Sequence, residues 1–211
     1  MSASLRRRVY LASRSPRRRE LLKQIGIEFE LLMLREGTDR GRDVDESPLP
    51  DEPPDAYAVR IAEAKAAVGM RYLMQRRLPR MYPVFPLVAA DTAVTLGDEI
   101  LGKPESAHHA ADMLRRLSGR THQVFTAVSV AFEDRVETAL SASAVTFRDL
   151  DDAEIAAYVA STEPMDKAGA YAIQGLAAVF IESLHGSYSG VMGLPLFETA
   201  RLLKHFGCGI L

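Results

Sequence analysis

Two long stretches of alternating apolar and polar residues in the middle of the chain constrain the fold most strongly. They cover Thr121–Phe132 and Arg135–Phe147, and only Glu133 and Asp134 separate them. Alternation with a period of two residues is typical of a strand that buries one of its faces, and a two-residue polar connection predicts a tight turn. We therefore expect a long antiparallel hairpin.

The start of the chain predicts a β-α-β arrangement. Residues 9–13 form a short apolar run, Ser15 and Pro16 begin a helix, and residues 28–34 form a second strand after the turn at Gly26. A sheet that contains this opening together with the antiparallel hairpin is mixed. The pattern therefore indicates the α/β class rather than a strict series of βαβ units.

The remaining elements are predicted from helical spacing, capping residues and turn residues. The middle third of the chain resembles an insertion between the first and last segments. The expected architecture is one α/β domain over residues 1–211, with two lobes, an extended mixed central sheet flanked by helices, and a cleft between the lobes. We expect a charged loop over residues 35–54, a helix from Asp55 to about Arg77, a strand over residues 84–96, a hairpin turn at Gly97 and Asp98, helices over residues 106–117, 151–161 and 195–207, and glycine-rich loops with short strands over residues 163–193.

Composition and charge exclude several classes of protein. The 211 residues are 47% apolar and can bury a substantial core, but the longest apolar runs, residues 84–90 and 176–181, fall short of the ~18 residues of a membrane span. The single cysteine, Cys208, can form neither an intrachain disulfide nor a CxxC zinc site. A formal net charge of −2 argues against a dedicated nucleic-acid binder. We expect a cytoplasmic protein without nucleic-acid or membrane partners.

The small net charge hides a strong separation of charge along the chain. Residues 1–23 carry eight Arg or Lys and one acid, Glu20, whereas residues 35–55 carry eight acids and three arginines. An Arg- and Ser-rich start is also typical of a transit peptide. The strand and helix predicted within the same residues argue against that alternative, because a cleavable segment would not usually carry the first two elements of a fold.

The turn before the first helix is a candidate phosphate site. Ser15 as N-cap and Pro16 at the first helical position leave free backbone N–H groups there. Arg17 and Arg18 in the first helical turn are unfavourable next to the positive end of the helix dipole unless an anion binds to them. Phosphate suits this arrangement of amides and guanidinium groups. Alternatively, these arginines pair with the acids of residues 35–55.

Two charged residues stand out because their surroundings are apolar. Asp91 interrupts the strand sequence Leu-Val-Ala-Ala-Asp-Thr-Ala-Val, so it is either a structural hydrogen-bonding group or a carboxylate that takes part in chemistry. Lys65 lies on the same helical face as Tyr57 and Ile61. Its amine either extends past the edge of the core or delivers a positive charge into a cleft.

Two further segments contain lysines and glycines. Residues 97–104 match the GxxxxGK pattern of a P-loop, but Pro104 replaces the Ser or Thr that would hold Mg²⁺, so we reject that assignment. Lys103 is then either a cation that reaches a phosphate or an exposed lysine beside a hairpin. Residues 163–175 combine Lys167 and several glycines with the amide of Gln174, which suits either a nucleotide site or an ordinary glycine-rich turn.

Taken together, these segments resemble the Maf family of nucleoside triphosphate pyrophosphatases. The resemblance implies a two-lobed α/β fold, often homodimeric, that hydrolyses nucleoside triphosphates to the monophosphate and pyrophosphate with a divalent metal, Mg²⁺ or Mn²⁺. The matching blocks follow one another across nearly the whole chain: residues 11–22 (LASRSPRRRELL), 90–92 (ADT), 100–104 (ILGKP), 117–122 (LSGRTH), 166–171 (DKAGAY) and 173–175 (IQG).

The resemblance also implies roles for individual residues. Asp91 corresponds to the general base and is a candidate metal ligand. In the loop over residues 35–46, the candidates for the family's acidic residue, and so for a further metal ligand, are Glu36 and Asp39. The form of residues 166–175 resembles the subgroup that acts on dTTP and UTP. The remaining site residues are Arg17, Thr92 and Gln174 for substrate choice, and Ser13, Arg18, Lys65, Lys103 and Lys167 for binding phosphate.

The chemistry of the reaction agrees with these residue types. Hydrolysis between the α- and β-phosphates needs in-line attack by water, a carboxylate that takes the proton of that water, and cations that hold the departing pyrophosphate. The resemblance therefore implies a house-cleaning pyrophosphatase for dTTP and UTP, and this chemistry is consistent with it. The alternatives are a nucleotide-binding regulator of septum formation or cell division, a pyrophosphatase for a modified purine such as 7-methyl-GTP, and a basic nucleic-acid module, which only the arginine-rich start supports.

Overall fold

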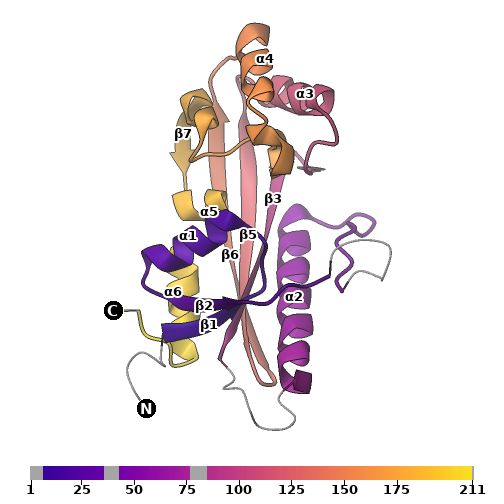
Figure 1. The fold of residues 1–211 in the computed structure, drawn as a ribbon. Coiled ribbons are helices and arrows are strands. Elements are labelled where there is room, and N and C mark those ends of the chain that lie inside the picture. Colours follow the sequence, from indigo (N-terminus) through magenta and orange to yellow (C-terminus); the bar gives the residue numbers. More distant parts are fainter. Residues whose placement is uncertain (1–6, 36–42, 77–84, 211) are drawn as a thin grey trace.

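The computed structural model describes residues 7–35, 43–76 and 85–210, and these residues form a seven-stranded mixed sheet flanked by helices (Figure 1). Six strands follow the order β2-β1-β3-β5-β6-β7, and β4 pairs with one end of β3. The expected α/β class with a mixed sheet is confirmed. The strands are β1 (Arg8–Leu11), β2 (Glu28–Leu31), β3 (Leu87–Leu96), β4 (Glu99–Leu101), β5 (Thr121–Phe132), β6 (Arg135–Phe147) and β7 (Ile181–His185).

The pairing of the strands confirms both arrangements predicted from the sequence. β1 runs parallel to β2 and to β3, with α1 between the first two strands. β5 and β6 form the long antiparallel hairpin, paired from Phe132 opposite Arg135 to Thr121 opposite Thr146. β3 pairs antiparallel with β5 over almost its whole length.

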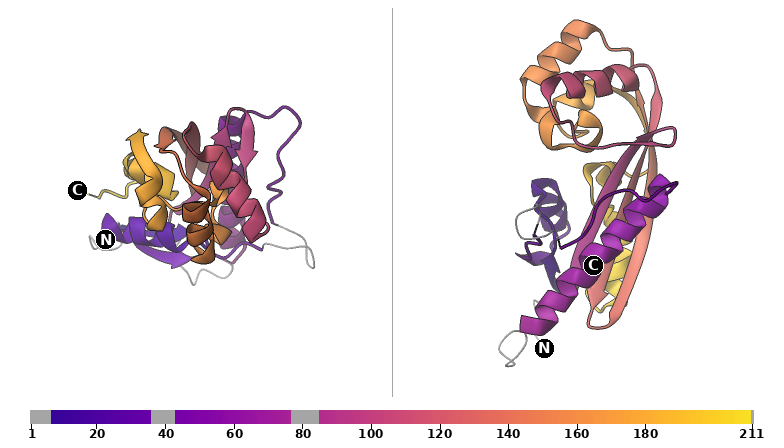
Figure 2. Two further views of the ribbon diagram at one scale, coloured as in Figure 1. Left: turned by 90° about the horizontal axis from the view of Figure 1, so that it is seen from above. Right: turned by 90° about the vertical axis from the view of Figure 1, so that its right-hand side faces the viewer.

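The helices gather into two lobes at opposite ends of the long strands (Figures 1 and 2). The first lobe contains β1, β2, α1, α2 and α6, and the second contains β4, β7, α3, α4 and three short 3₁₀ turns over residues 163–166, 168–170 and 176–180. β3, β5 and β6 run through both lobes. The helices are α1 (Pro16–Gln24), α2 (Pro54–Arg76), α3 (Ala107–Leu117), α4 (Asp152–Ala160), α5 (Tyr188–Met192) and α6 (Leu196–His205).

The two faces of β3 pack against different helices in the first lobe. Leu87 and Ala89 pack against α2, whereas Val88 and Ala90 pack in the cluster that contains residues of α1 and α6. α2 packs so closely against the sheet that a Cβ atom at position 69 would lie 2.6 Å from the side chain of Leu87, and Gly69 avoids this clash. By the same alternation, residues 91 and 92 face opposite sides of the sheet.

β3 has an open edge at residues 89–93. β1 reaches only as far as Val88, and β4 begins to pair at Val94. Between these two points, β3 is paired with β5 on one side, and no strand in the described part of the chain covers its other side. The chain after β1 leaves the sheet here and turns at Ser13 into α1. This open edge is where the two lobes leave room for a ligand.

Capping explains where several helices begin. The side chain of Ser15 accepts a hydrogen bond from the backbone of Arg18 at the start of α1, as predicted. Asp151 and Glu154 form both hydrogen bonds of a capping box at the start of α4. In the described ranges 7–35, 43–76 and 85–210, no helix is both long and apolar enough to cross a membrane.

Some predicted boundaries and elements are wrong. β1 and β2 end at Leu11 and Leu31 rather than at residues 13 and 34, because the chain leaves the sheet to form the cavity wall. Residues 163–193 contain the short helix α5 and the three 3₁₀ turns, with only one strand, β7, instead of loops and several strands. Local bonds between residues three apart, such as Lys167 N–H to the Pro164 carbonyl, favour the 3₁₀ turns.

Candidate active site

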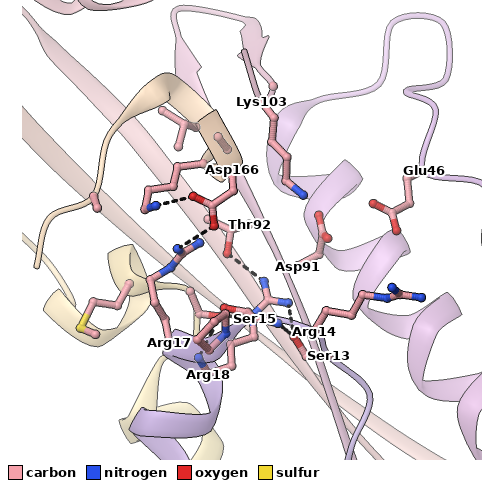
Figure 3. Close-up of a pocket in the computed structure, with 18 of the residues that line it drawn as sticks. Ser13, Arg14, Ser15, Arg17, Arg18, Glu46, Asp91, Thr92, Lys103 and Asp166 are labelled. Atoms are coloured by element: carbon pink, nitrogen blue, oxygen red, sulfur yellow. Dashed lines mark hydrogen bonds and ion pairs between the residues drawn. The ribbon is translucent and has the colours of Figure 1, made fainter. Parts of the chain in front are cut away.

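A cavity of about 610 Å³ lies between the two lobes, beside the open edge of β3 (Figure 3). Its walls come from the β1–α1 turn, from α2, from the loop that contains Glu46, from the segment after β4 and from residues 166–174. These parts are far apart in the sequence, and the fold brings them to one place.

Every predicted site residue that the structure describes lines this cavity. The two acids proposed for the loop, Glu36 and Asp39, lie outside the described residues. The residues in the cavity wall are Ser13, Arg17, Arg18, Lys65, Asp91, Thr92, Lys103, Lys167 and Gln174.

Arg18 is held in the cavity wall by three hydrogen bonds. Its Nε donates to the carbonyl of Gly193 over 2.7 Å, Nη1 donates to Ser13 Oγ over 3.3 Å, and Nη2 donates to Thr92 Oγ1 over 3.3 Å. Burial lowers the pKa of Arg18 from its ordinary value, and the nearby carboxylate of Asp91 opposes this effect. A guanidinium fixed in this way keeps further N–H donors for an anion in the cavity.

Thr126 supports Thr92 from the neighbouring strand. The two residues are paired across β3 and β5, and their hydroxyl oxygens lie 3.0 Å apart. The Thr126 hydroxyl also donates to the carbonyl of Gly190 in α5 over 2.8 Å. Thr126 is completely buried, so its hydroxyl fixes the position of Thr92 without contacting solvent.

Asp91 and Thr92 lie side by side but face different partners. Asp91 points toward α2, where the ammonium of Lys65 donates to Asp91 Oδ1 over 2.8 Å and lies 3.0 Å from Glu46 Oε1. Lys65 therefore delivers its charge into the cavity, which is one of the two alternatives left open by the sequence. Tyr57 donates to the backbone carbonyl of Glu46 over 3.0 Å, and burial together with the charges of Asp91 and Glu46 raises the pKa of Tyr57 to about 12.

An ion pair connects the two lobes across the cavity. Arg17 Nη1 of α1 lies 3.6 Å from Asp166 Oδ2, and Asp166 also accepts a hydrogen bond from Lys167 (Figure 3). Although partial burial acts to raise it, these two cations hold the pKa of Asp166 below its ordinary value. Among the described acids of residues 43–55, none forms a salt bridge with Arg17. Lys103 extends into the cavity from the segment after β4.

Gln174 lies in a turn, and Glu163 is hydrogen-bonded to the backbone directly after that turn. The turn is closed by a hydrogen bond from the Gly175 N–H to the carbonyl of Ala172, 3.0 Å long. The carboxylate of Glu163 accepts a hydrogen bond from the next residue, Leu176 N–H, over 3.1 Å. The backbone carbonyl of Glu163 also accepts a hydrogen bond from the ammonium of Lys167 over 2.7 Å.

A buried histidine stands behind Tyr171 in the cavity wall. His122 Nε2 lies 2.8 Å from the Tyr171 hydroxyl, and Nδ1 of the same ring has no hydrogen-bond partner among the described residues. Burial lowers the pKa of His122 to about 4, so the ring is neutral at neutral pH. The aromatic rings of Phe147 and Tyr171 pack edge-on around it.

Sequence reasoning missed three residues: Glu46 in the cavity wall, and Thr126 and Glu163, which contact residues of that wall. Glu46 is one of eight acids in residues 35–55, and no pattern in that segment distinguishes it from the others. Thr126 has the appearance of an ordinary strand residue. Glu163 belongs to the block that suggested a nucleotide site, but its contacts lie more than ten positions further along the chain, and no local pattern indicates them.

The pair Glu46 and Asp91 could help to hold a divalent cation. Their oxygens lie within 3.0 Å of one positive charge, the Lys65 ammonium, so the pair already accommodates a cation. The described residues contain no group of three or more His, Cys, Asp or Glu with the geometry of a metal site. Mg²⁺ commonly takes one or two carboxylate ligands from a protein and others from substrate phosphates, and Glu46 and Asp91 have the chemistry for that role.

The chain matches a family model and many known proteins over nearly its full length. The family model described as Maf-like protein matches residues 8–206. A dTTP/UTP pyrophosphatase of Nitrosomonas europaea is 54% identical over 202 residues, which cover 96% of this chain and 96% of that protein. A protein of the same name from Aromatoleum aromaticum is 56% identical over 202 residues, which cover 95% of this chain and 96% of that protein. A third, from Nitrosospira multiformis, is 56% identical over 197 residues, covering 93% of each chain.

Proposed function

We propose that this chain, which belongs to the family of Maf-like proteins, is a nucleoside triphosphate pyrophosphatase that converts dTTP and UTP to the nucleoside monophosphate and pyrophosphate. One observation carries the proposal beyond the names of its relatives. The carboxylate of Asp91 faces a cavity whose walls also hold the cationic side chains Arg17, Arg18, Lys65, Lys103 and Lys167. This combination suits one small polyanion that is attacked by water.

Asp91 acts as the general base in this proposal. Its carboxylate takes a proton from a water molecule, whose oxygen then forms a bond to the α-phosphorus while the bond to the oxygen bridging the α- and β-phosphorus atoms breaks. Lys65 holds Asp91 Oδ1 at 2.8 Å, which leaves the other carboxylate oxygen for the water. The proton ends on Asp91 and the bridging oxygen leaves with pyrophosphate.

The cations stabilise the negative charge that develops on the departing pyrophosphate. Arg18 is already oriented by Gly193, Ser13 and Thr92, so it needs little rearrangement when charge builds up. Arg17 is held less tightly, by one ion pair with Asp166 over 3.6 Å. It exchanges that partner for a phosphate oxygen when the nucleotide binds.

A divalent cation, Mg²⁺ or Mn²⁺, supplies further positive charge to the phosphate oxygens when it is bound. Asp91 and Glu46 are the described side chains that would hold it.

Selection among nucleotides is assigned to Arg17, Thr92 and Gln174. All three side chains line the cavity, from α1, β3 and the turn before the third 3₁₀ segment. The amide of Gln174 offers both a donor and an acceptor, which suits the alternating carbonyl and N–H groups of thymine and uracil. The relatives named dTTP/UTP pyrophosphatase support this choice of bases over 7-methylguanine.

The cellular role that we propose is house-cleaning of the nucleotide pool by one catalytic domain over residues 1–211. We place the protein in the cytoplasm as a homodimer that has no nucleic-acid or membrane partner. The near-neutral net charge of −2 supports a local pocket for a small polyanion rather than a surface for a long one.

A panel of substrates tests the proposed function. The purified protein is mixed with dTTP, UTP, CTP, ATP, GTP or 7-methyl-GTP and with Mg²⁺ or Mn²⁺, and the release of pyrophosphate is measured. We expect release from dTTP and UTP well above release from the others. Tight binding of nucleotides without release would favour the regulator, and preference for 7-methyl-GTP would favour the other subgroup.

A further inference from the structure

Glu163 contacts the two ends of the segment from Lys167 to Gln174 with different atoms. Its backbone carbonyl accepts the hydrogen bond from the Lys167 ammonium, 2.7 Å long. Its carboxylate accepts hydrogen bonds from the backbone N–H groups of Leu176 over 3.1 Å and Ala177 over 3.5 Å, directly after the turn that carries Gln174. One residue outside the cavity wall is therefore hydrogen-bonded to Lys167 and to the backbone N–H groups that follow Gln174.

The carboxylate is itself fixed in place. The hydroxyl of Tyr158 in α4 donates to Glu163 Oε1 over 2.9 Å. A side chain at position 175 would lie 2.3 Å from Glu163 Oε2, so the carboxylate occupies the space that a larger residue than Gly175 would need. Gly175 is therefore required here for the close approach of the carboxylate and not for an unusual backbone angle, since its φ is −106°.

We propose that Glu163 is a positioning residue that sets the Gln174 turn relative to Lys167 and thereby controls discrimination between nucleobases. This inference rests on the proposed function. A hydrogen-bonding side chain discriminates only when its own backbone is held in one place, because a loose amide adapts to the wrong base as well as to the right one. Hydrogen bonds from backbone N–H groups to an ionised carboxylate are among the stronger ones in proteins.

The two contacts separate base selection from phosphate binding. Lys167 is held by the backbone carbonyl of Glu163, which every substitution retains, whereas the Gln174 turn is held by the side chain. Removal of the carboxylate should therefore loosen Gln174 and leave Lys167 in position. General damage to the fold would instead affect both.

Glu163→Gln tests this directly. The ratio of kcat/KM for dTTP to kcat/KM for CTP should fall roughly tenfold, because glutamine keeps only one of the two acceptor oxygens and loses the charge that strengthens these hydrogen bonds. The change should appear mainly in the KM for dTTP, while kcat stays close to that of the unmodified protein. The inhibition constant of inorganic pyrophosphate should change by less than about twofold, since Lys167 keeps its contact.

Gly175→Ala displaces the same carboxylate by a second route. Its methyl group would occupy the position of the Glu163 oxygens, and the backbone at residue 175 accepts alanine without strain. We expect the same loss of discrimination. The double variant Glu163→Gln/Gly175→Ala should be no worse than either single variant, because both remove one interaction.

Glu154→Gln is the matched control. Glu154 is also a carboxylate that accepts a backbone N–H hydrogen bond in the second lobe, from Asp151 over 3.2 Å, but it does not line the cavity. Its replacement should lower the thermal unfolding midpoint and leave the ratio of dTTP to CTP unchanged. Amide hydrogen exchange at Leu176 and Ala177 should accelerate in Glu163→Gln and in Gly175→Ala but not in Glu154→Gln.

The outcomes separate this inference from the proposed function. If the unmodified protein releases no pyrophosphate from any nucleotide, the proposed function fails, and the same variants are compared by calorimetric binding of non-hydrolysable dTTP and CTP analogues. An unchanged preference in both Glu163→Gln and Gly175→Ala would overturn the role of Glu163. Two further results would overturn it as well. One is that the losses of discrimination in the two single variants add fully in the double variant, and the other is that pyrophosphate binding weakens by the same factor as discrimination between dTTP and CTP.

Discussion

Replacing Asp91 with asparagine gives the sharpest test of the proposed reaction. The change removes one negative charge and the capacity to take a proton, and it keeps the shape of the side chain. General bases contribute on the order of 10²–10⁴ to the rate, so kcat for dTTP should fall by about that factor, which corresponds to about 3–5 kcal/mol in the activation barrier.

The structure limits the cost of this change to the fold. Lys65 keeps its contact with Glu46 at 3.0 Å, and the asparagine oxygen can still accept its hydrogen bond. The side chain of Lys65 is therefore not left without a partner, and the loss in free energy of unfolding should be about 1 kcal/mol. For a chain of this size, that loss lowers the thermal midpoint by about 2–4 °C.

Three measurements on the same preparation separate chemistry from binding and folding. Pyrophosphate release gives kcat and KM, titration calorimetry gives nucleotide affinity, and thermal unfolding gives the midpoint. Affinity should be kept or increased in Asp91→Asn, because the carboxylate that is lost repels the phosphates. Glu52→Gln serves as control, since Glu52 is a largely buried acid that pairs with Arg60 outside the cavity.

A kcat within a few-fold of the unmodified value in Asp91→Asn would refute the assignment of Asp91 as base. Loss of nucleotide binding together with turnover would assign Asp91 to substrate binding instead. A similar fall in kcat for Glu52→Gln would mean that general loosening of the first lobe accounts for the effect.

Substitutions at three further residues test other parts of the site. Thr126→Val should lower kcat/KM for dTTP roughly tenfold while Thr126→Ser restores it, because only the hydroxyl is needed; steady-state kinetics that do not distinguish the two variants would contradict this. Asp166→Asn should tighten inhibition by pyrophosphate about two- to fivefold, because the exposed carboxylate no longer competes for Arg17 and Lys167; weaker inhibition would count against that competition. His122 has a folded-state pKa of about 4 against an ordinary value of 6.5, so the unfolded chain takes up a proton first as pH falls. The free energy of unfolding, measured with urea, should therefore decrease between pH 6.5 and 4 by up to roughly 3 kcal/mol, and His122→Phe should remove that part of the pH dependence.

Local signals in the sequence predicted much of the fold. The hairpin of β5 and β6, the cap at Ser15 and the capping box at Asp151 depend on neighbouring residues, so they can be recognised from short segments. Asp91 was recognisable because a carboxylate within an apolar strand needs a partner. The spacing along α2 placed Lys65 on the apolar face of that helix, but only the structure identifies it as the partner of Asp91.

The parts that could not be predicted depend on contacts between distant segments. Glu46 reaches the cavity because Tyr57 and Lys65 of α2 hold the preceding loop against the helix, and one acid among eight cannot be selected without that packing. Residues 163–180 fold into 3₁₀ turns partly because Glu163 accepts N–H groups 13 and 14 residues further along. A pattern based on alternation or helical period does not register such contacts.

The three long strands have a mechanical consequence. β3, β5 and β6 pass without interruption from one lobe into the other, and they are hydrogen-bonded to one another along the way. Movement of one lobe relative to the other would have to bend or unpair all three strands at once. The continuous sheet therefore keeps the width of the cavity between the lobes fixed. We expect adjustment to a nucleotide to be confined to side chains and to the segments around Glu46 and Asp166. The sheet thus holds the cationic side chains and the Asp91 carboxylate at a fixed separation before the substrate arrives.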